Sequence, residues 1–344
     1  MASRVRLVDV ARNAGVSPTT ASLILSGSRA DAFASATQEK VHEAARTLGY
    51  TRSILGSSLK SGATRTICFF YTPPMDRFVE RFQLHASTRL EEENLHLVSI
   101  PVRIGEEQQI VNALSCGLYD SACLACNPTS AEALMELLPT PPIPTMIFGT
   151  LPPGPAYIGV TIDETAGISE ALSGLVNGGA QKIAYLTQRR NAEELDKEPR
   201  WQIYNSFLAD ARCTNPSLQA PRLLAYTEGT IPSAFQCATA LFTDRDTIPD
   251  AVYCDSDRVA IGAVLAATHC GIAIPDDLQI IGTGASVDGG DLHPALSTIG
   301  IDNRDLDSAV TLLSTLSGEE PESTTLTLRW HYIPRGTTHS RETT

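Results

Sequence analysis

Residues 7–27, LVDVARNAGVSPTTASLILSG, constrain the fold of this chain more than any other segment. The apolar residues that recur there at helical spacing are Leu7, Val10, Ala11 and Ala14. Gly15 follows them and supplies the left-handed conformation that ends a helix. Ser17 is a preferred N-cap and Pro18 a preferred first helical residue. The segment therefore predicts two short helices joined by a tight turn.

The second helix of this pair presents small hydroxyl and apolar side chains to solvent. Ala21, Ile24 and Leu25 recur on one face and are expected to point inward. The outward-facing residues are Pro18, Thr19, Thr20, Ser22, Leu23 and Ser26. A face of small side chains permits close approach to phosphates and base edges. With Ser17 at its start, this helix is predicted to bind DNA.

A third amphipathic helix is predicted over Thr37–Leu48. Its apolar face is formed by Val41, Ala44, Ala45 and Leu48, and Gly49 ends it. A helix pair alone would be common in an ordinary hydrophobic core. Three helices within fifty residues instead favour a DNA-binding headpiece over residues 1–50.

The residues of this headpiece resemble the opening pattern of the LacI/GalR family, DVAxxAGVSxxTVSxVLN followed by a helix ending in LGY. The matching residues are Asp9, Val10, Ala11, Ala14, Gly15, Val16, Ser17, Ser22, Leu25, Leu48, Gly49 and Tyr50. The resemblance implies a sequence-specific transcriptional regulator, most often a repressor, that binds operator DNA as a homodimer. It implies also that a small-molecule effector controls DNA binding.

The charge distribution agrees with a DNA contact confined to the headpiece. Residues 1–62 carry eight Lys and Arg against four acidic residues, a net charge of +4, whereas the remaining residues carry −17. Basic residues attract the phosphate backbone and an acidic body repels it. The acidic net charge of the whole chain is therefore compatible with DNA binding.

In the resembled family, residues 51–63 correspond to a hinge that becomes helical on operator DNA. The resemblance places Leu59 as an apolar wedge in the minor groove. Ser53 can cap this helix, but Gly56 lowers its helix propensity by about 1 kcal/mol relative to Ala. The hinge is therefore predicted to depend strongly on DNA for folding.

Residues 64–334 alternate β-rich runs with helical stretches, which predicts parallel sheets wound by βαβ units. The predicted strands are 66–71, 96–102, 121–126, 145–149, 158–162, 182–187, 223–226, 251–254 and 279–284. Because the pattern occurs twice, we expect two similar lobes. The resemblance implies the α/β two-lobed fold of periplasmic binding proteins, with the effector at the carboxyl ends of the strands. Residues 335–344 are predicted to be a polar tail.

Two segments resemble effector-binding motifs of the family. Arg200 begins a match to R-x-x-G-[YFW], so the resemblance implies that its guanidinium contacts the effector. Asp257 lies in a match to A-N-D-x-x-A-x-G, in which Ser256 replaces the usual Asn. The plain alternatives are a surface charge for Arg200 and an N-cap role for Asp257.

Three further positions are candidates for the cleft by the same resemblance. Tyr71 and Phe78 border the first strand and helix crossing, although both could instead be core residues. Gly284 lies where the family has aspartates, and Ile301 replaces a frequently polar residue. The expected effector is a sugar or sugar derivative. These losses of hydrogen-bonding side chains nevertheless favour a less polar, anionic or differently placed ligand.

The eight cysteines are predicted to be small buried hydrophobes and not a disulfide framework. Cys123 and Cys126 form a CxxC, but on a strand residues three apart point to opposite faces, so neither redox nor metal function is expected. The sequence has no apolar signal segment and no stretch of transmembrane length, so a cytoplasmic protein without membrane contact is expected.

The main alternative is a nucleotide-dependent α/β enzyme, or a small-molecule binding protein with a degenerate headpiece. GTGASVDGG (282–290) contains a G-x-G after a strand, but Val287 replaces the third glycine of the dinucleotide fingerprint. Because hydrolase, zinc-protease and Walker motifs are also missing, we expect no enzyme activity, no cofactor and no metal.

Base specificity is expected from Thr19 and Leu23. Leu23 stands where the family often has Arg, so it offers an apolar contact, for example to a thymine methyl group. Ser17, Thr20 and Ser22 are expected to hold phosphates.

Overall fold

The computed structural model describes residues 5–26, 32–50, 63–73, 75–126, 128–149, 157–188, 192–244, 247–316 and 325–339. The chain forms two compact units, Met1–Arg65 and Thr66–Thr344, and each is described by itself. Among the helices of the described residues, none is both long and apolar enough to cross a membrane.

The first unit consists of α1 (Leu7–Ala14), α2 (Pro18–Leu25) and α3 (Ser35–Leu48). The buried side chains that hold it together are Val10, Ala11, Ala21, Ile24, Val41, Ala44 and Ala45. Gly15 and Gly49 end α1 and α3 with φ values of 68° and 64°, as the sequence predicts. The predicted hinge residues Ser53, Gly56 and Leu59 lie outside the described residues.

The second unit contains two six-stranded sheets, each forming one lobe. The N-lobe sheet has the order β11-β5-β4-β3-β1-β2, and all its pairs are parallel. Its strands are β1 (Thr66–Tyr71), β2 (His96–Pro101), β3 (Ser121–Ala125), β4 (Thr145–Phe148), β5 (Ile158–Asp163) and β11 (Thr325–Arg329). Its helices are α5 (Arg77–Glu92), α6 (Gln108–Leu114), α7 (Pro128–Leu137) and α14 (Asn303–Thr315).

The C-lobe sheet has the order β12-β10-β9-β8-β6-β7, in which only the edge pair β10 and β12 is antiparallel. Its strands are β6 (Ile183–Gln188), β7 (Arg222–Tyr226), β8 (Ala251–Cys254), β9 (Gln279–Thr283), β10 (Ser297–Gly300) and β12 (His331–Ile333). Its helices are α8 (Thr165–Asn177), α9 (Ala192–Asp196), α10 (Pro199–Thr214), α11 (Ile231–Phe242), α12 (Asp257–His269) and α13 (Val287–Gly290).

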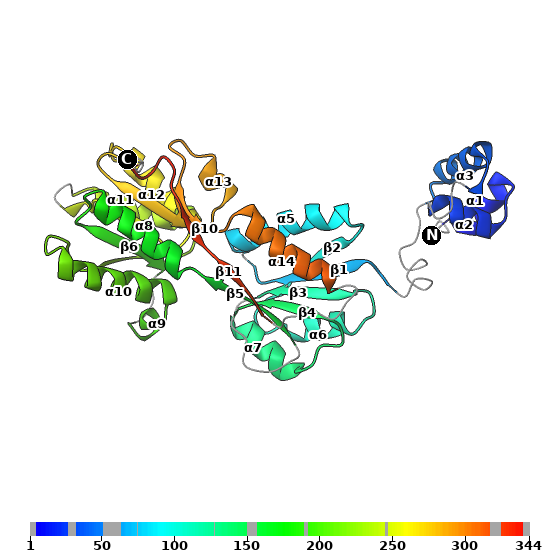
Figure 1. Cartoon of the computed structure of the whole chain (residues 1–344), viewed down its shortest axis with the longest axis horizontal. Coiled ribbons are helices and arrows are strands. Elements are labelled where there is room, and N and C mark those ends of the chain that lie inside the picture. Colours follow the sequence, from blue (N-terminus) through cyan, green and yellow to red (C-terminus); the bar gives the residue numbers. More distant parts are fainter. Residues whose placement is uncertain are drawn as a thin grey trace. The chain divides into compact units, whose positions relative to one another are not determined.

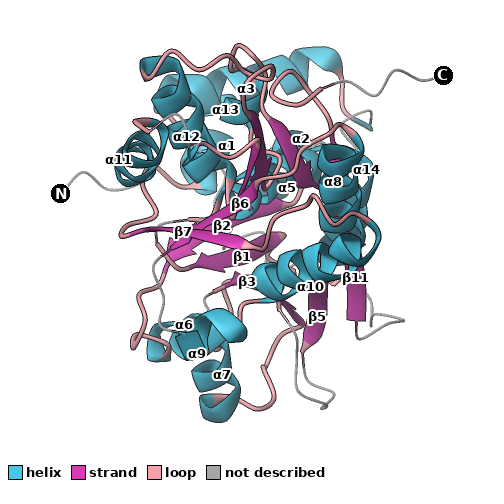
Figure 2. Cartoon of the chain, turned by 90° about the vertical axis from the view of Figure 1, so that its left-hand side faces the viewer, coloured by secondary structure: helices cyan, strands magenta, loops and turns pink. Residues whose placement is uncertain are grey.

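Helices cover both faces of the C-lobe sheet. Figure 2 shows α11 and α12 on one side of β6 and β7, and α8 and α10 on the other. Successive residues of β6 alternate between these layers, because Ile183 and Tyr185 belong to one core cluster and Ala184 and Leu186 to the other. A strand buried on both faces is apolar throughout, which explains why the sequence identified it.

The chain passes between the lobes three times. It crosses from β5 to α8, returns from β10 to α14, and crosses again between β11 and β12 at Trp330. In Figure 1, β11 (red) lies beside β5 at these crossings. One core cluster contains residues of both lobes, including Ile67, Ile183 and Trp330. The crossing segments are therefore packed into the core.

The nine predicted strands are confirmed to within two residues at either end. Three strands were not predicted, namely β10, β11 and β12. Two other expectations are wrong. Residues 335–339 are not a polar tail, because Thr337 is fully buried and bonds both Ile280 and Ser297. The cysteines are not all buried, since Cys116 and Cys213 are exposed.

Candidate functional sites

The start of α2 is fixed by its own hydroxyl groups. Ser17 Oγ accepts a hydrogen bond of 3.0 Å from the backbone N–H of Thr20, as an N-cap does. The hydroxyls of Ser17 and Thr20 are also hydrogen bonded to each other at 2.8 Å. Pro18 and Thr19 are exposed beside them. The predicted phosphate-binding hydroxyls are therefore ordered before any contact with DNA.

The rest of the predicted DNA face is partly exposed. Ser22 and Leu23 each retain some accessible surface on α2. Ser26 donates a hydrogen bond of 3.0 Å to the backbone oxygen of Leu23 and so closes the end of the helix. Leu23 and Thr19 thus remain the predicted base-contacting residues, and Ser26 has a structural role as well.

In the second unit, the carboxyl ends of the two sheets face each other. Arg258, at the start of α12, donates a hydrogen bond of 3.4 Å to the backbone oxygen of Met75, which follows β1. Arg77, at the start of α5, forms an ion pair of 2.8 Å with Asp288 on α13. These contacts join the N-lobe to the C-lobe across the predicted effector cleft.

A pocket of about 440 Å³ opens at the N-lobe side of this cleft. Its walls are mostly apolar. The lining residues are Thr72, Pro73, Met75, Asp76, Val79, Ile104, Ala125, Cys126 and Phe148. They end or follow the strands β1, β2, β3 and β4 at their carboxyl ends, or belong to the start of α5. The volume is that of a small-molecule site.

The C-lobe side is polar, and Arg200 is its central cation. Arg200 Nη2 and Nε form a two-pronged ion pair with Glu164 at 2.6 and 2.5 Å, and Nη1 donates to the backbone oxygen of Asp255 at 2.5 Å. Its guanidinium also lies 5.9 Å from the centre of the Trp330 ring. Burial lowers the pKa of Arg200, but the Glu164 carboxylate outweighs this and raises it above the ordinary value.

Arg200 is therefore a partly buried cation held by the protein itself, and these contacts argue against a plain surface charge. Three of its five N–H donors are already used within the protein. Contact with an effector through the remaining donors stays a prediction.

Asp255 directly follows β8 and was not among the site residues predicted from the sequence. Its Oδ2 accepts hydrogen bonds from the hydroxyls of Tyr226 and Thr187 at 2.7 and 2.9 Å, and from the N–H of Gln188 at 3.2 Å. Its Oδ1 is buried and has no hydrogen-bond partner among the described residues. Its position could have indicated a site residue, because Asp255 is the first polar residue after the apolar strand AVYC.

Asp257 is fully buried and bonded within the protein. Its Oδ1 accepts from the Thr298 hydroxyl at 2.6 Å, and its Oδ2 from the N–H of Ser286 at 2.5 Å. Burial raises the pKa of Asp257, although these hydrogen bonds lower it in part. The residue joins α12 to β10 and to the loop before α13, and its contact with an effector stays a prediction.

The glycines of GTGASVDGG serve this packing. A Cβ at Gly282 would lie 2.2 Å from Asp257 Oδ1, so only glycine fits there without a shift. Gly284 has a φ of 124° and is buried, with the Asp257 carboxylate and Arg77 nearby. Because close packing accounts for Gly282 and a positive φ for Gly284, the motif gives no support to a dinucleotide site.

The other predicted effector residues lie around the cleft in different ways. Ser256 is the partly exposed N-cap of α12 and makes no side-chain capping bond. Tyr71 is partly buried against the core. Phe78 is only 3% exposed and packs on Phe148 and Trp330 at ring distances of 5.7 and 5.3 Å. Phe148 therefore belongs to the pocket wall, whereas Phe78 packs against Phe148 and does not line the pocket.

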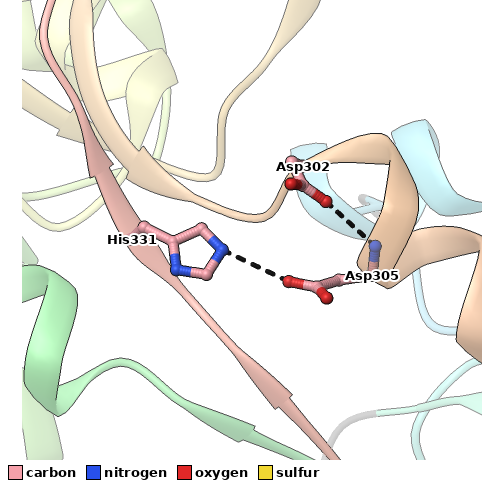
Figure 3. Close-up of side chains that lie close together, drawn as sticks. All are labelled: Asp302, Asp305 and His331. Carbon is pink, nitrogen blue, oxygen red and sulfur yellow. Dashed lines mark hydrogen bonds and ion pairs between the residues drawn. The ribbon is translucent and has the colours of Figure 1, made fainter.

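Asp302, Asp305 and His331 lie together where the chain crosses between the lobes (Figure 3). Their potential ligand atoms lie within 4.8 Å of one another. Asp302 accepts from the N–H of Asp305 at 2.9 Å and caps α14, while His331 Nε2 lies 3.2 Å from Asp305 Oδ2. These bonds hold the second and third crossing segments together, and they explain the cluster without an ion.

Two protein-family models match separate segments of the chain. Residues 6–53 match the model for bacterial regulatory proteins of the lacI family, and residues 172–338 match the model for a periplasmic binding protein-like domain.

Curated relatives match most of the chain. The HTH-type transcriptional regulator RegA of Clostridium acetobutylicum is 27% identical over 334 residues, covering 95% of this chain and 97% of RegA. The HTH-type transcriptional repressor PurR of Vibrio cholerae is 27% identical over 290 residues, covering 80% of each chain. Both relatives are named as regulators of transcription.

Among solved structures, the lac repressor dimer bound to operator and the anti-inducer ONPF has a TM-score of 0.71 to this chain at 21% identity. The match covers 98% of this chain and 100% of the repressor chain. The expected architecture of a helix-turn-helix unit followed by a two-lobed α/β unit is therefore confirmed.

Proposed function

The chain belongs to the LacI/GalR family of bacterial transcriptional regulators, and from this we propose that it is a dimeric, operator-binding repressor controlled by a small-molecule effector. The observation that carries the proposal is the capped α2 helix, with Thr19 and Leu23 accessible, on a chain that also contains a two-lobed ligand-binding fold. Operator DNA lies in the bacterial cytoplasm, where the proposal places the protein.

In the proposed complex, α2 lies in the major groove. Leu23 and Thr19 contact base edges, whereas Ser17 and Thr20 present preordered hydroxyls to phosphates. The predicted hinge contributes Ser53 and Leu59 to the minor groove in the same proposal.

The effector acts by linkage. A ligand that favours one arrangement of the lobes changes operator affinity, and operator DNA must change ligand affinity by the same factor. The proposal includes no catalytic step and no nucleotide cofactor.

The test is selection of bound sequences from random duplex DNA by the full-length protein at one fixed salt concentration. We expect a two-fold symmetric motif, because a homodimer presents two copies of α2. If no motif is enriched, either alone or with metabolite extracts added, the proposal is wrong.

Two substitutions on α2 separate base contacts from phosphate contacts. Leu23→Ala is expected to change the preferred base in each half-site, because it removes the apolar contact. Ser22→Ala should weaken binding to all sequences by a similar factor, since phosphates carry no sequence information. An unchanged base preference in Leu23→Ala would exclude the assigned role of Leu23.

A further inference from the structure

The pocket at the N-lobe side of the cleft has a wall of apolar side chains that the protein covers only in part. Met75, Val79 and Phe148 pack against the core of the second unit and keep some accessible surface. Ile104 lines the same pocket and is 59% exposed. Apolar surface gathered at a concave site gains free energy when a ligand removes it from water. The wall therefore favours a ligand part that is itself apolar.

Two of the lining side chains carry sulfur, those of Met75 and Cys126, and a third is the phenyl ring of Phe148. Burial raises the pKa of Cys126 to about 11, although a hydrogen bond with Thr72 lowers it in part, so the thiol is uncharged near pH 7. Uncharged sulfur makes favourable contacts with aromatic rings, and a phenyl ring prefers an edge-to-face or offset aromatic partner. An aromatic ligand would thus gain contacts here that a saturated ligand of similar size would not.

The polar groups of the pocket already have partners within the protein. Asp76 Oδ1 accepts a hydrogen bond of 2.8 Å from the N–H of Phe78 and so caps α5. The Cys126 thiol donates to the backbone oxygen of Phe70 at 4.0 Å and is hydrogen bonded to Thr72. Because a buried sugar needs a partner for nearly every hydroxyl, three polar side chains that are already bonded match a sugar poorly.

Charged side chains are scarce around this pocket. Asp76 is the one charged residue among the described residues that line it. The strands β1, β3 and β4 are followed in the sequence by Pro74, Asn127 and residues 150–156, and none of these is charged. Arg258, on the C-lobe, is hydrogen bonded to the backbone beside the pocket but does not line it. An uncharged group therefore fits this pocket, whereas a buried anion would lack a paired cation among its lining side chains.

We infer that the N-lobe pocket binds an uncharged aromatic ring system of the effector, against the sulfur atoms of Met75 and Cys126 and the ring of Phe148. The inference rests on the proposed function, which supplies a ligand for the cleft. It also narrows that function, because the effector is then not a simple sugar. The pocket volume of about 440 Å³ is sufficient for one or two fused six-membered rings.

Calorimetric titration of the full-length protein with three probes tests the ligand class. The probes are 2-naphthol, which is uncharged at pH 7, its saturated counterpart decahydro-2-naphthol, and D-galactose. We expect 2-naphthol to bind at least about threefold more tightly than decahydro-2-naphthol, because only aromatic rings gain the sulfur and edge contacts. D-Galactose should bind at least about tenfold more weakly than 2-naphthol, because the pocket leaves its hydroxyls unpaired. Equal affinities of the two bicyclic probes, no binding of 2-naphthol, or tightest binding of D-galactose would each overturn the inference.

Met75→Leu tests the contact with sulfur. Leucine nearly keeps the volume of methionine but lacks its sulfur, so the preference for 2-naphthol over decahydro-2-naphthol should fall by about half or more. Met135→Leu on α7 is the matched control, because Met135 is also partly buried but does not line the pocket. An unchanged preference in Met75→Leu would contradict the assigned contact.

Val79→Thr tests the location of the ring. The substitution places a hydroxyl on the pocket wall with little change of shape, so the affinity for 2-naphthol should fall at least about threefold. Val98→Thr on β2 is the control, because Val98 is 40% exposed and does not line the pocket. If Val79→Thr binds 2-naphthol as tightly as the wild type does, the ring binds elsewhere and the inference is wrong.

Selection of operator DNA with the same protein preparation separates this inference from the proposed function. If a two-fold symmetric motif is selected but 2-naphthol does not bind, the ligand class is wrong and the proposed function stands. If 2-naphthol binds with the expected preference but no motif is selected, the pocket assignment stands and the regulatory function does not.

Discussion

The two lobes have the same strand order but opposite chemistry at their facing edges. The N-lobe edge presents mainly apolar side chains, among them Met75, Val79 and Phe148. The C-lobe edge presents the ion pair of Arg200 and Glu164 with further buried carboxylates. The N-lobe therefore provides an apolar wall to the predicted cleft, and the C-lobe provides polar groups that are already bonded to one another.

Glycine packing shows how tightly the centre of the C-lobe is built. A Cβ at Gly262, Gly282 or Gly300 would lie less than 3.0 Å from another atom. At the loop position Gly229 of the same lobe, a Cβ would meet no atom within 4 Å. Close packing leaves little room for the C-lobe polar groups to move.

The largest effect is expected from Arg200→Ala. The substitution leaves the largely buried Glu164 carboxylate without its ion-pair partner, so the second unit should lose about 3 kcal/mol of unfolding free energy. Urea titration of the full chain would measure the loss. The exposed pair of Lys197 and Glu193 provides the control, and Lys197→Ala should cause no measurable change. A loss below 1 kcal/mol in Arg200→Ala would contradict a structural role for this partly buried ion pair.

Gly282→Ala tests the packing of the C-lobe. The new Cβ would clash with the Asp257 carboxylate, and relief of the clash should cost about 2 kcal/mol of stability. Gly229→Ala is the control, because a Cβ there meets no atom within 4 Å. Thermal unfolding of both variants would show the difference, and equal midpoints would rule out the proposed constraint.

Phe148→Leu tests the apolar wall of the N-lobe. Phe148 makes edge contacts with Phe82 and Phe78 at ring distances of 5.0 and 5.7 Å, so its loss should cost about 1 kcal/mol. The exposed Leu137→Ala should leave the unfolding free energy unchanged. If Phe148→Leu lowered the free energy of unfolding as much as Arg200→Ala does, the proposed difference between the two lobes would be wrong.

The smallest effect is a pair of opposite pH dependences. Burial raises the pKa of Asp257 in the C-lobe, so the folded protein binds more protons there than the unfolded chain does. The stability of the wild type relative to Asp257→Asn should therefore fall as pH rises from about 4, the unfolded-state value, through the raised folded value.

Glu107 in the N-lobe is the opposite case. The backbone N–H of Gly105, with the Ser130 hydroxyl, lowers the pKa of Glu107. The stabilisation that ionised Glu107 provides is complete above the pKa that Glu107 has in the unfolded chain. It is lost as the pH falls through the lower pKa that Glu107 has in the folded protein. Relative to Glu107→Gln, wild-type stability should thus rise with pH. Urea titrations between pH 3 and pH 7 would measure both slopes, and slopes of equal sign would contradict the assignment.

The sequence predicted most of the architecture because local signals determine it. The runs TICFFY and AVYC are buried on both faces and stand between turn residues, so they were identified as strands. β10 was missed because two of its four residues are polar, and β11 and β12 because they lie at sheet edges, where exposed positions interrupt the apolar pattern. β11 also pairs with β5, a partner that no local window contains.

The sequence was less informative about the cleft. Arg200 was found by its motif, but its pairing with Glu164 depends on the crossing from β5 to α8. Phe78 and Phe148 are both aromatic residues near strand ends, and only packing decides that Phe148 lines the pocket. Asp255 needs its contacts with β6 and β7 before its unpaired oxygen becomes evident.

The triple crossing has a consequence for synthesis of the protein on the ribosome. β5 pairs with β11, so that Gly159 faces Thr325 and the N-lobe sheet cannot be completed until residues 325–329 have been made. The strands β6 to β10 of the C-lobe emerge earlier than this last N-lobe strand. A nascent chain that stops before residue 325 would expose an open edge at β5, which is the kind of surface that chaperones and proteases recognise.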